Sequence, residues 1–112
     1  MTMTERAQGN VDKMRTLKFS GHSDDVFQYY DSTGGGDEAY GSPAIFKLTH
    51  KDYSLLVVGY YNAQDGCGCW SVGLCQTDEN LPLPPWSPRF ETKGYSTVLY
   101  LNVPDSVKVE AL

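Results

Sequence analysis

The feature that most constrains the fold is a pair of apolar runs on either side of a short polar cluster, within residues 53–75. Residues 62–66 supply the Asn, Asp and Gly that are typical of a tight turn, so the two runs predict a β-hairpin. The first run, residues 53–61, has almost no polar residue, which predicts a strand covered on both faces at the centre of a sheet. In the second run Trp70 and Leu74 fall on the same side of the alternation and are expected to share one face.

Shorter alternating segments predict the remaining strands. They lie at residues 14–20, 26–30, 44–50, 96–103 and 107–110. The segment 44–50 runs into the hairpin through Lys51 and Asp52, which predicts a three-stranded antiparallel meander over residues 44–75. No segment has a sustained helical period. We therefore expect an all-β fold, a small antiparallel β-sandwich or open barrel of six to seven strands with little helix.

A chain of 112 residues is long enough for one hydrophobic core and too short for two. Residues 1–13 are polar and without period, so we expect a flexible N-terminal segment followed by a single β domain at residues 14–112. The sequence has no apolar run long enough to cross a membrane. Its three cysteines make no evident disulfide framework. A cytoplasmic protein is the expectation.

Negative charge is concentrated in one part of the chain. The sequence has 14 acidic and 9 basic residues, and the segment 24–38 contains no Lys or Arg. The acidic residues of this segment are Asp24, Asp25, Asp31, Asp37 and Glu38. A solvated loop face is one interpretation, and an acidic recognition surface or a cation site is the other. The net charge of −5 argues against direct binding to nucleic acid or to an anionic membrane.

Two long loops are expected between the strands. Residues 31–42 contain three consecutive glycines, which predict a flexible loop. Residues 81–89 contain four prolines, which predict an extended surface segment. Within it, Trp86 either packs against the sheet together with Phe90, or is exposed and available as a contact anchor.

Two groups of residues have chemistry that metal sites use. His22 is followed by Asp24 and Asp25, which are candidates for a metal site or an acid–base pair, although hydrogen bonds within a turn explain them equally well. Cys67 and Cys69 offer two thiolates, but four ligands are needed for structural zinc.

Small cysteines buried in the core or placed at a tight turn are therefore the favoured interpretation. Along an extended strand Cys75 would stand about 20 Å from Cys69, so these two cysteines cannot ligate the same metal ion. We expect no catalytic residue and no cofactor. The weak metal candidates are His22, Asp24, Cys67 and Cys69.

The opening Phe19-Ser-Gly-His-Ser-Asp-Asp25 resembles that of small uncharacterised phage and prophage proteins. A cysteine before a Trp-x-x-Gly strand, here Cys69–Gly73, and a Pro-x-Trp-x-x-Arg-Phe element, here Pro84–Phe90, are similar to theirs as well. The resemblance implies a bacterial or viral cytoplasmic setting and favours an accessory or inhibitor protein directed at a host, such as an anti-defence protein. It gives no evidence for a catalytic residue.

Taken together, the sequence predicts a non-enzymatic binding protein that presents its acidic loop to a protein partner. Eight tyrosines, some of which must lie at a surface, suit such a role. The expected binding residues are Asp24, Asp25, Tyr30, Asp37, Glu38, Tyr40, Trp86 and Arg89. One alternative is a protein that binds or sequesters a small ligand such as a nucleotide or sugar, and another is a metal-binding protein or hydrolase that uses His22, Asp24 and Asp25.

Overall fold

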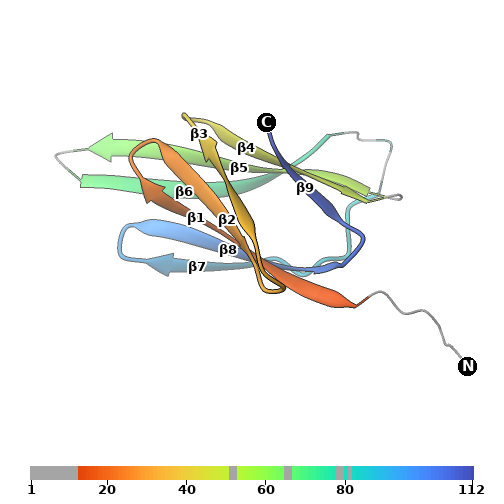
Figure 1. Cartoon of the computed structure of the whole chain (residues 1–112). Coiled ribbons are helices and arrows are strands. Elements are labelled where there is room, and N and C mark those ends of the chain that lie inside the picture. Colours follow the sequence, from red (N-terminus) through yellow and green to blue (C-terminus); the bar gives the residue numbers. More distant parts are fainter. Residues whose placement is uncertain (1–12, 51–52, 65–66, 78–79, 81) are drawn as a thin grey trace, which may run out of the picture.

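The computed structural model describes residues 13–50, 53–64, 67–77, 80 and 82–112. These residues form nine strands and no helix, arranged as two antiparallel sheets that face each other without closing into a barrel (Figure 1). The five-stranded sheet has the order β3 (Gly36–Tyr40), β2 (Val26–Asp31), β1 (Met14–Ser23), β8 (Ser96–Pro104) and β7 (Arg89–Lys93). The four-stranded sheet has the order β6 (Cys67–Gln76), β5 (Tyr53–Gln64), β4 (Ala44–His50) and β9 (Lys108–Ala111). The predicted all-β antiparallel sandwich is confirmed.

The meander predicted over residues 44–75 is present as β4, β5 and β6, with β5 in the middle. Leu55 and Val57 of β5 are buried against the other sheet, whereas Leu56 on its outer face is only half-buried and Tyr60 is 49% exposed. Val58, on the same outer face, is buried at 9% exposed, so the expectation that both faces of this strand are covered is right at Val58 and wrong at Leu56 and Tyr60. An apolar run in a two-sheet sandwich has one opposing sheet, so its alternate residues face outward.

Two strands were not expected from the sequence, and they raise the number from six or seven to nine. The first is β3, which pairs with β2 inside the segment expected to be a flexible glycine loop. The turn before it is ordered by hydrogen bonds from the amides of Asp31 and Gly34, and Gly34 and Gly35 adopt positive φ angles that favour glycine. The second is β7, which pairs with β8 directly after the proline segment.

The core lies between the sheets and consists of side chains that alternate inward along each strand. Leu17 and Phe19 of β1 are fully buried, as the alternation in residues 14–20 predicts. The Phe19 ring stacks near Phe27 of its own sheet, and both rings contact Phe46 from the facing sheet, with centroids 5.6–6.5 Å apart. Burying each such side chain stabilises the fold by about 1.5–3 kcal/mol.

The two tryptophans lie near opposite ends of β5. Trp70 packs beside Tyr61 near the end of that strand, with centroids 5.5 Å apart. Trp86 is 6% exposed and packs edge-on against Tyr53 at the start of the strand. The proline segment therefore packs on the sandwich through Trp86, as one of the two alternatives predicted. Phe90, expected to pack beside it, is 48% exposed.

The two cysteines whose side chains the structure describes, Cys69 and Cys75, are not core residues. Cys69 is half-buried and Cys75 is exposed, because the side of β6 opposite Trp70 faces outward. The prediction of small buried cysteines is wrong for Cys75. The side chain of Cys67 and most of the expected flexible N-terminal segment, residues 1–12, lie outside what the structure describes.

Candidate functional site

The acidic and tyrosine residues expected to bind a partner gather at one edge of the five-stranded sheet. Strand β3 is the last strand of that sheet and pairs with β2. Glu38 lies opposite Gln28 in this pair, and Tyr40 lies opposite Val26. Asp37, Glu38 and Tyr40 are all exposed, so the edge presents two carboxylates and a phenol to solvent. We call β3, the outer face of β2 and the β1–β2 turn the acidic edge.

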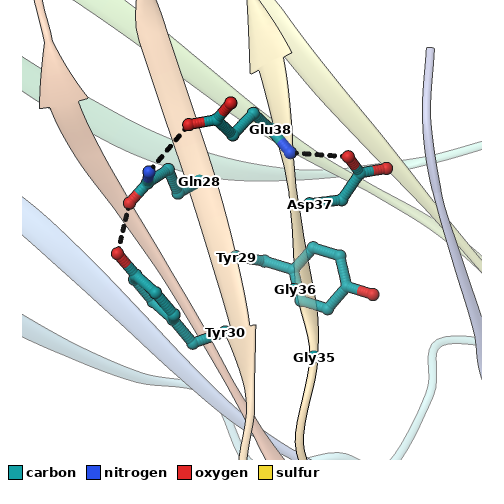
Figure 2. Close-up of a pocket in the computed structure, with 7 residues that line it drawn as sticks. All are labelled: Gln28, Tyr29, Tyr30, Gly35, Gly36, Asp37 and Glu38. Carbon is teal, nitrogen blue, oxygen red and sulfur yellow. Dashed lines mark hydrogen bonds between the residues drawn. The ribbon is translucent and has the colours of Figure 1, made fainter.

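A chain of hydrogen bonds fixes the side chains of this edge (Figure 2). The Tyr30 hydroxyl donates to the amide oxygen of Gln28, and the Gln28 amide nitrogen donates to Glu38 Oε2 at 2.9 Å. The Tyr40 hydroxyl donates to Glu38 Oε1, also at 2.9 Å. The hydrogen bond from Gln28, followed by that from Tyr40, lowers the pKa of Glu38. Glu38 therefore keeps its charge in mildly acidic solution.

The edge is notched where β3 begins. A cavity of about 380 Å³ opens there, and Gly36 leaves it free of a side chain. A Cβ at Gly36 would lie 2.5 Å from the backbone oxygen of Tyr29, so a larger residue requires the backbone to shift. The cavity is lined by Gln28, Tyr29, Tyr30, Gly35, Gly36, Asp37 and Glu38 (Figure 2).

Asp24 and Asp25 continue the acidic edge at the turn between β1 and β2. The Gly41 amide, directly after Tyr40, donates to the backbone oxygen of Asp25 at 3.1 Å. The carboxylate of Asp24 accepts a hydrogen bond from the Tyr61 hydroxyl at 3.0 Å. Both aspartates are exposed. Four of the five acids in the segment 24–38 are therefore available to a partner.

The fifth acid, Asp31, has a structural role. Its side chain is 8% exposed and forms an ion pair with Arg15 at 3.2 Å. Its Oδ1 also accepts hydrogen bonds from the amide and hydroxyl of Thr33, which order the β2–β3 turn. Among the described acids of this segment, Asp31 alone has a basic ion-pair partner. The uniform acidic segment expected from the sequence divides into four surface acids and one buried one.

Arg89 and Trp86 do not join the acidic edge. Arg89 opens β7 at the opposite edge of the sheet, about 19 Å from β3 by four inter-strand spacings. Its guanidinium lies 4.3 Å from the Tyr100 ring centroid and forms an ion pair with Glu91. Trp86 is buried, so it is not available as a surface anchor.

The candidate metal residues come together only in part. His22 and Asp24 line one cavity together with Tyr61, whereas Cys69 is placed on β6, opposite Asn62 of β5. Within the described part of the chain, no group of three or more His, Cys, Asp or Glu side chains is close enough to hold a metal ion. The arrangement offers hydrogen-bond acceptors and negative charge.

Residues that the sequence did not single out complete the site. Gln28 links two predicted residues, Tyr30 and Glu38, and the signal for it was its outward place in the alternation of 26–30. Its role depends on the pairing of β2 with β3. The sequence did not predict that pairing, because its three glycines indicated a flexible loop. The sequence alone places Tyr61 on the predicted hairpin and assigns it no role at the site. In the structure its hydrogen bond to Asp24 connects the two sheets.

No family model, curated protein or solved structure matches this chain. The resemblance to small phage and prophage proteins therefore stays a prediction. No described residue belongs to a helix long and apolar enough to cross a membrane.

Proposed function

We propose that this protein is a non-enzymatic binding module whose acidic edge docks on a basic surface of a protein partner. The observation that carries the proposal is the edge itself: four exposed acids and two exposed tyrosines on one sheet margin. Tyr30 is 48% exposed and Tyr40 is 64% exposed. Tyrosines of this kind supply contact area at protein interfaces, and like-charged carboxylates select a partner of opposite charge.

The arrangement of the edge supports a protein partner more than a small ligand. Glu38 is fixed by Gln28 and Tyr40, so little side-chain entropy is lost when it meets a cation. The charged groups lie along a strand and a turn rather than converging on a single point. Such a spread-out surface can guide a basic partner and speed association through long-range attraction.

The setting expected from the sequence belongs to the same proposal. A phage-type accessory or inhibitor protein in a bacterial or host cytoplasm would use an acidic edge to occupy the basic surface of a host protein, including one that otherwise binds nucleic acid. The negative charge of the edge supports this role.

The test is comparative capture from a bacterial lysate with three immobilised proteins. The wild type is compared with D37N/E38Q and with D105N/E110Q. The second variant removes the same charge from exposed positions on the β8–β9 turn and β9. We expect a protein captured by the wild type and the control variant and depleted on D37N/E38Q, identified by mass spectrometry.

Equal capture by all three proteins would exclude the acidic edge as the contact surface. Loss on both double variants would point to net charge alone and would contradict the proposal as well. Circular dichroism and thermal unfolding of each variant serve as the control that it remains folded.

A further inference from the structure

A second cavity, of about 230 Å³, lies where the β1–β2 turn of one sheet meets the β5–β6 hairpin of the other. Its lining is formed by Gly21, His22, Ser23, Asp24, Tyr61, Gly68, Trp70 and Ser96. The side chains of these lining residues carry one carboxylate, one imidazole, three hydroxyls and two aromatic rings. The lining contains no Lys or Arg.

The walls of this cavity depend on two glycines. A Cβ at Gly21 would lie 1.8 Å from Trp70 Cδ1, and a Cβ at Gly68 would lie 1.7 Å from the Tyr61 hydroxyl oxygen. Both rings therefore lie directly on glycine backbone. The Trp70 indole Nε1 donates to the Ser23 carbonyl oxygen at 2.7 Å, which fixes the ring between the sheets.

The carboxylate is held in place before any ligand arrives. Asp24 Oδ1 accepts the Tyr61 hydroxyl at 3.0 Å, across the two sheets. For Asp24 Oδ2, the described residues give no hydrogen-bond partner. The hydrogen bond to Asp24 is the main cause of a raised pKa for Tyr61, so the phenol remains a donor to the carboxylate to a higher pH than an ordinary tyrosine.

The chemistry of the lining residues limits the class of ligand that this cavity can bind. An anion would find a carboxylate and no Lys or Arg side chain. A metal ion would find fewer than three of its usual ligand side chains. A planar cation with several N–H donors would find the Asp24 carboxylate and the hydroxyl oxygens as acceptors, an arrangement that suits a guanidinium better than an ammonium.

We propose that this cavity receives the guanidinium group of an arginine side chain of the protein partner. The proposal rests on the proposed function and deepens it, because it names the anchor residue that the partner supplies. The cavity is continuous with the acidic edge, since Asp25 follows Asp24 and its carbonyl bonds the amide next to Tyr40. A partner seated on the edge can therefore reach the cavity.

The test uses N-methylguanidinium as the probe and methylammonium as the matched cation. Two-dimensional ¹H–¹⁵N NMR follows the amides of residues 21–24 and the indole N–H of Trp70 during each titration. We expect saturable shifts with N-methylguanidinium at these positions. Replacing Asp24 by Asn should weaken binding by about tenfold, the effect of losing a charge-assisted hydrogen bond. Asp105→Asn, an exposed aspartate on another turn, should leave it unchanged.

Tyr61→Phe keeps the ring and removes the hydroxyl that orients Asp24, so we expect a smaller loss of affinity than in Asp24→Asn. Equal shifts with methylammonium, shifts spread over the whole surface, or unchanged binding in Asp24→Asn would each overturn the proposal. If N-methylguanidinium fails while capture still depends on Asp37 and Glu38, the arginine cavity is rejected and the proposed function stands. If the probe binds at the cavity while capture does not depend on Asp37 and Glu38, the guanidinium site stands and the acidic edge is rejected as the contact surface.

Discussion

Replacing Asp31 by Asn separates the structural acid of the segment 24–38 from those proposed to bind. The Asp31 carboxylate lies 3.2 Å from Arg15, and the two side chains are 8% and 15% exposed. Asparagine keeps the oxygen that accepts from the amide and hydroxyl of Thr33. The substitution therefore removes the charge and leaves the turn hydrogen bonds in place.

The cost follows from the buried guanidinium that remains. Breaking a fully buried ion pair by removing one partner destabilises a protein by about 3–5 kcal/mol. Because this pair retains some exposure, and because Arg15 still donates to the carbonyl of Val107, we expect a smaller loss of about 2–3 kcal/mol. For a domain of this size, that shifts the thermal midpoint by roughly 8–20 °C.

Urea unfolding followed by tryptophan fluorescence measures the effect, with Asp105→Asn as an exposed control. We expect a lower midpoint for Asp31→Asn at an unchanged slope, and a control within about 0.5 kcal/mol of the wild type. Equal stability of the two variants would refute the structural role assigned to Asp31. Capture of a partner by the folded fraction should be unaffected.

Three further predictions concern packing and titration. Gly21→Ala places a methyl group against the ring of a buried tryptophan and should destabilise the fold by about 3 kcal/mol in urea unfolding, whereas Gly73→Ala, with open space around its Cβ, should be neutral or slightly stabilising. Trp86→Ala should cost about 3–5 kcal/mol in the same assay, because the ring is buried against the start of β5; a loss below about 1 kcal/mol would mean that the proline segment does not pack there. The pKa values of Tyr40 and Tyr61 are raised by their hydrogen bonds to Glu38 and Asp24, so the stability from these bonds is present below about pH 10 and is lost as the pH rises through the raised values. Absorbance titration at alkaline pH should lose a late-titrating phenol in Tyr61→Phe, and an unchanged titration curve would contradict this.

The fold class followed from local patterns because seven of the nine strands have their own signal in the sequence. Leu17 and Phe19 alternate with polar residues, and both are fully buried. The meander of β4, β5 and β6 consists of neighbours in the chain, so short connections determined their pairing. Strand β3 gave no such signal, because Gly, Asp and Glu are poor strand formers and the pairing with β2 supplies the order.

The candidate site was predictable in its residue types and not in its grouping. The acids from Asp24 to Glu38 stood out by charge alone. The ion pair between Asp31 and Arg15 depends on the register between β1 and β2. This register places Asp31 opposite Leu17, two residues from Arg15. The contact between Asp24 and Tyr61 joins residues that are 37 positions apart in the chain and lie on different sheets. No local sequence pattern predicts a contact of this kind.

The most direct test of the acidic edge is the affinity of the captured partner at increasing salt. The Debye length falls from about 8 Å at physiological ionic strength to about 3 Å at 1 M, so contacts between exposed charges weaken steeply. We predict that the dissociation constant for the wild type rises with salt. For a variant that combines D24N, D25N, D37N and E38Q, we predict weaker binding with little dependence on salt. Equal affinity and equal salt dependence of the two proteins would contradict the account.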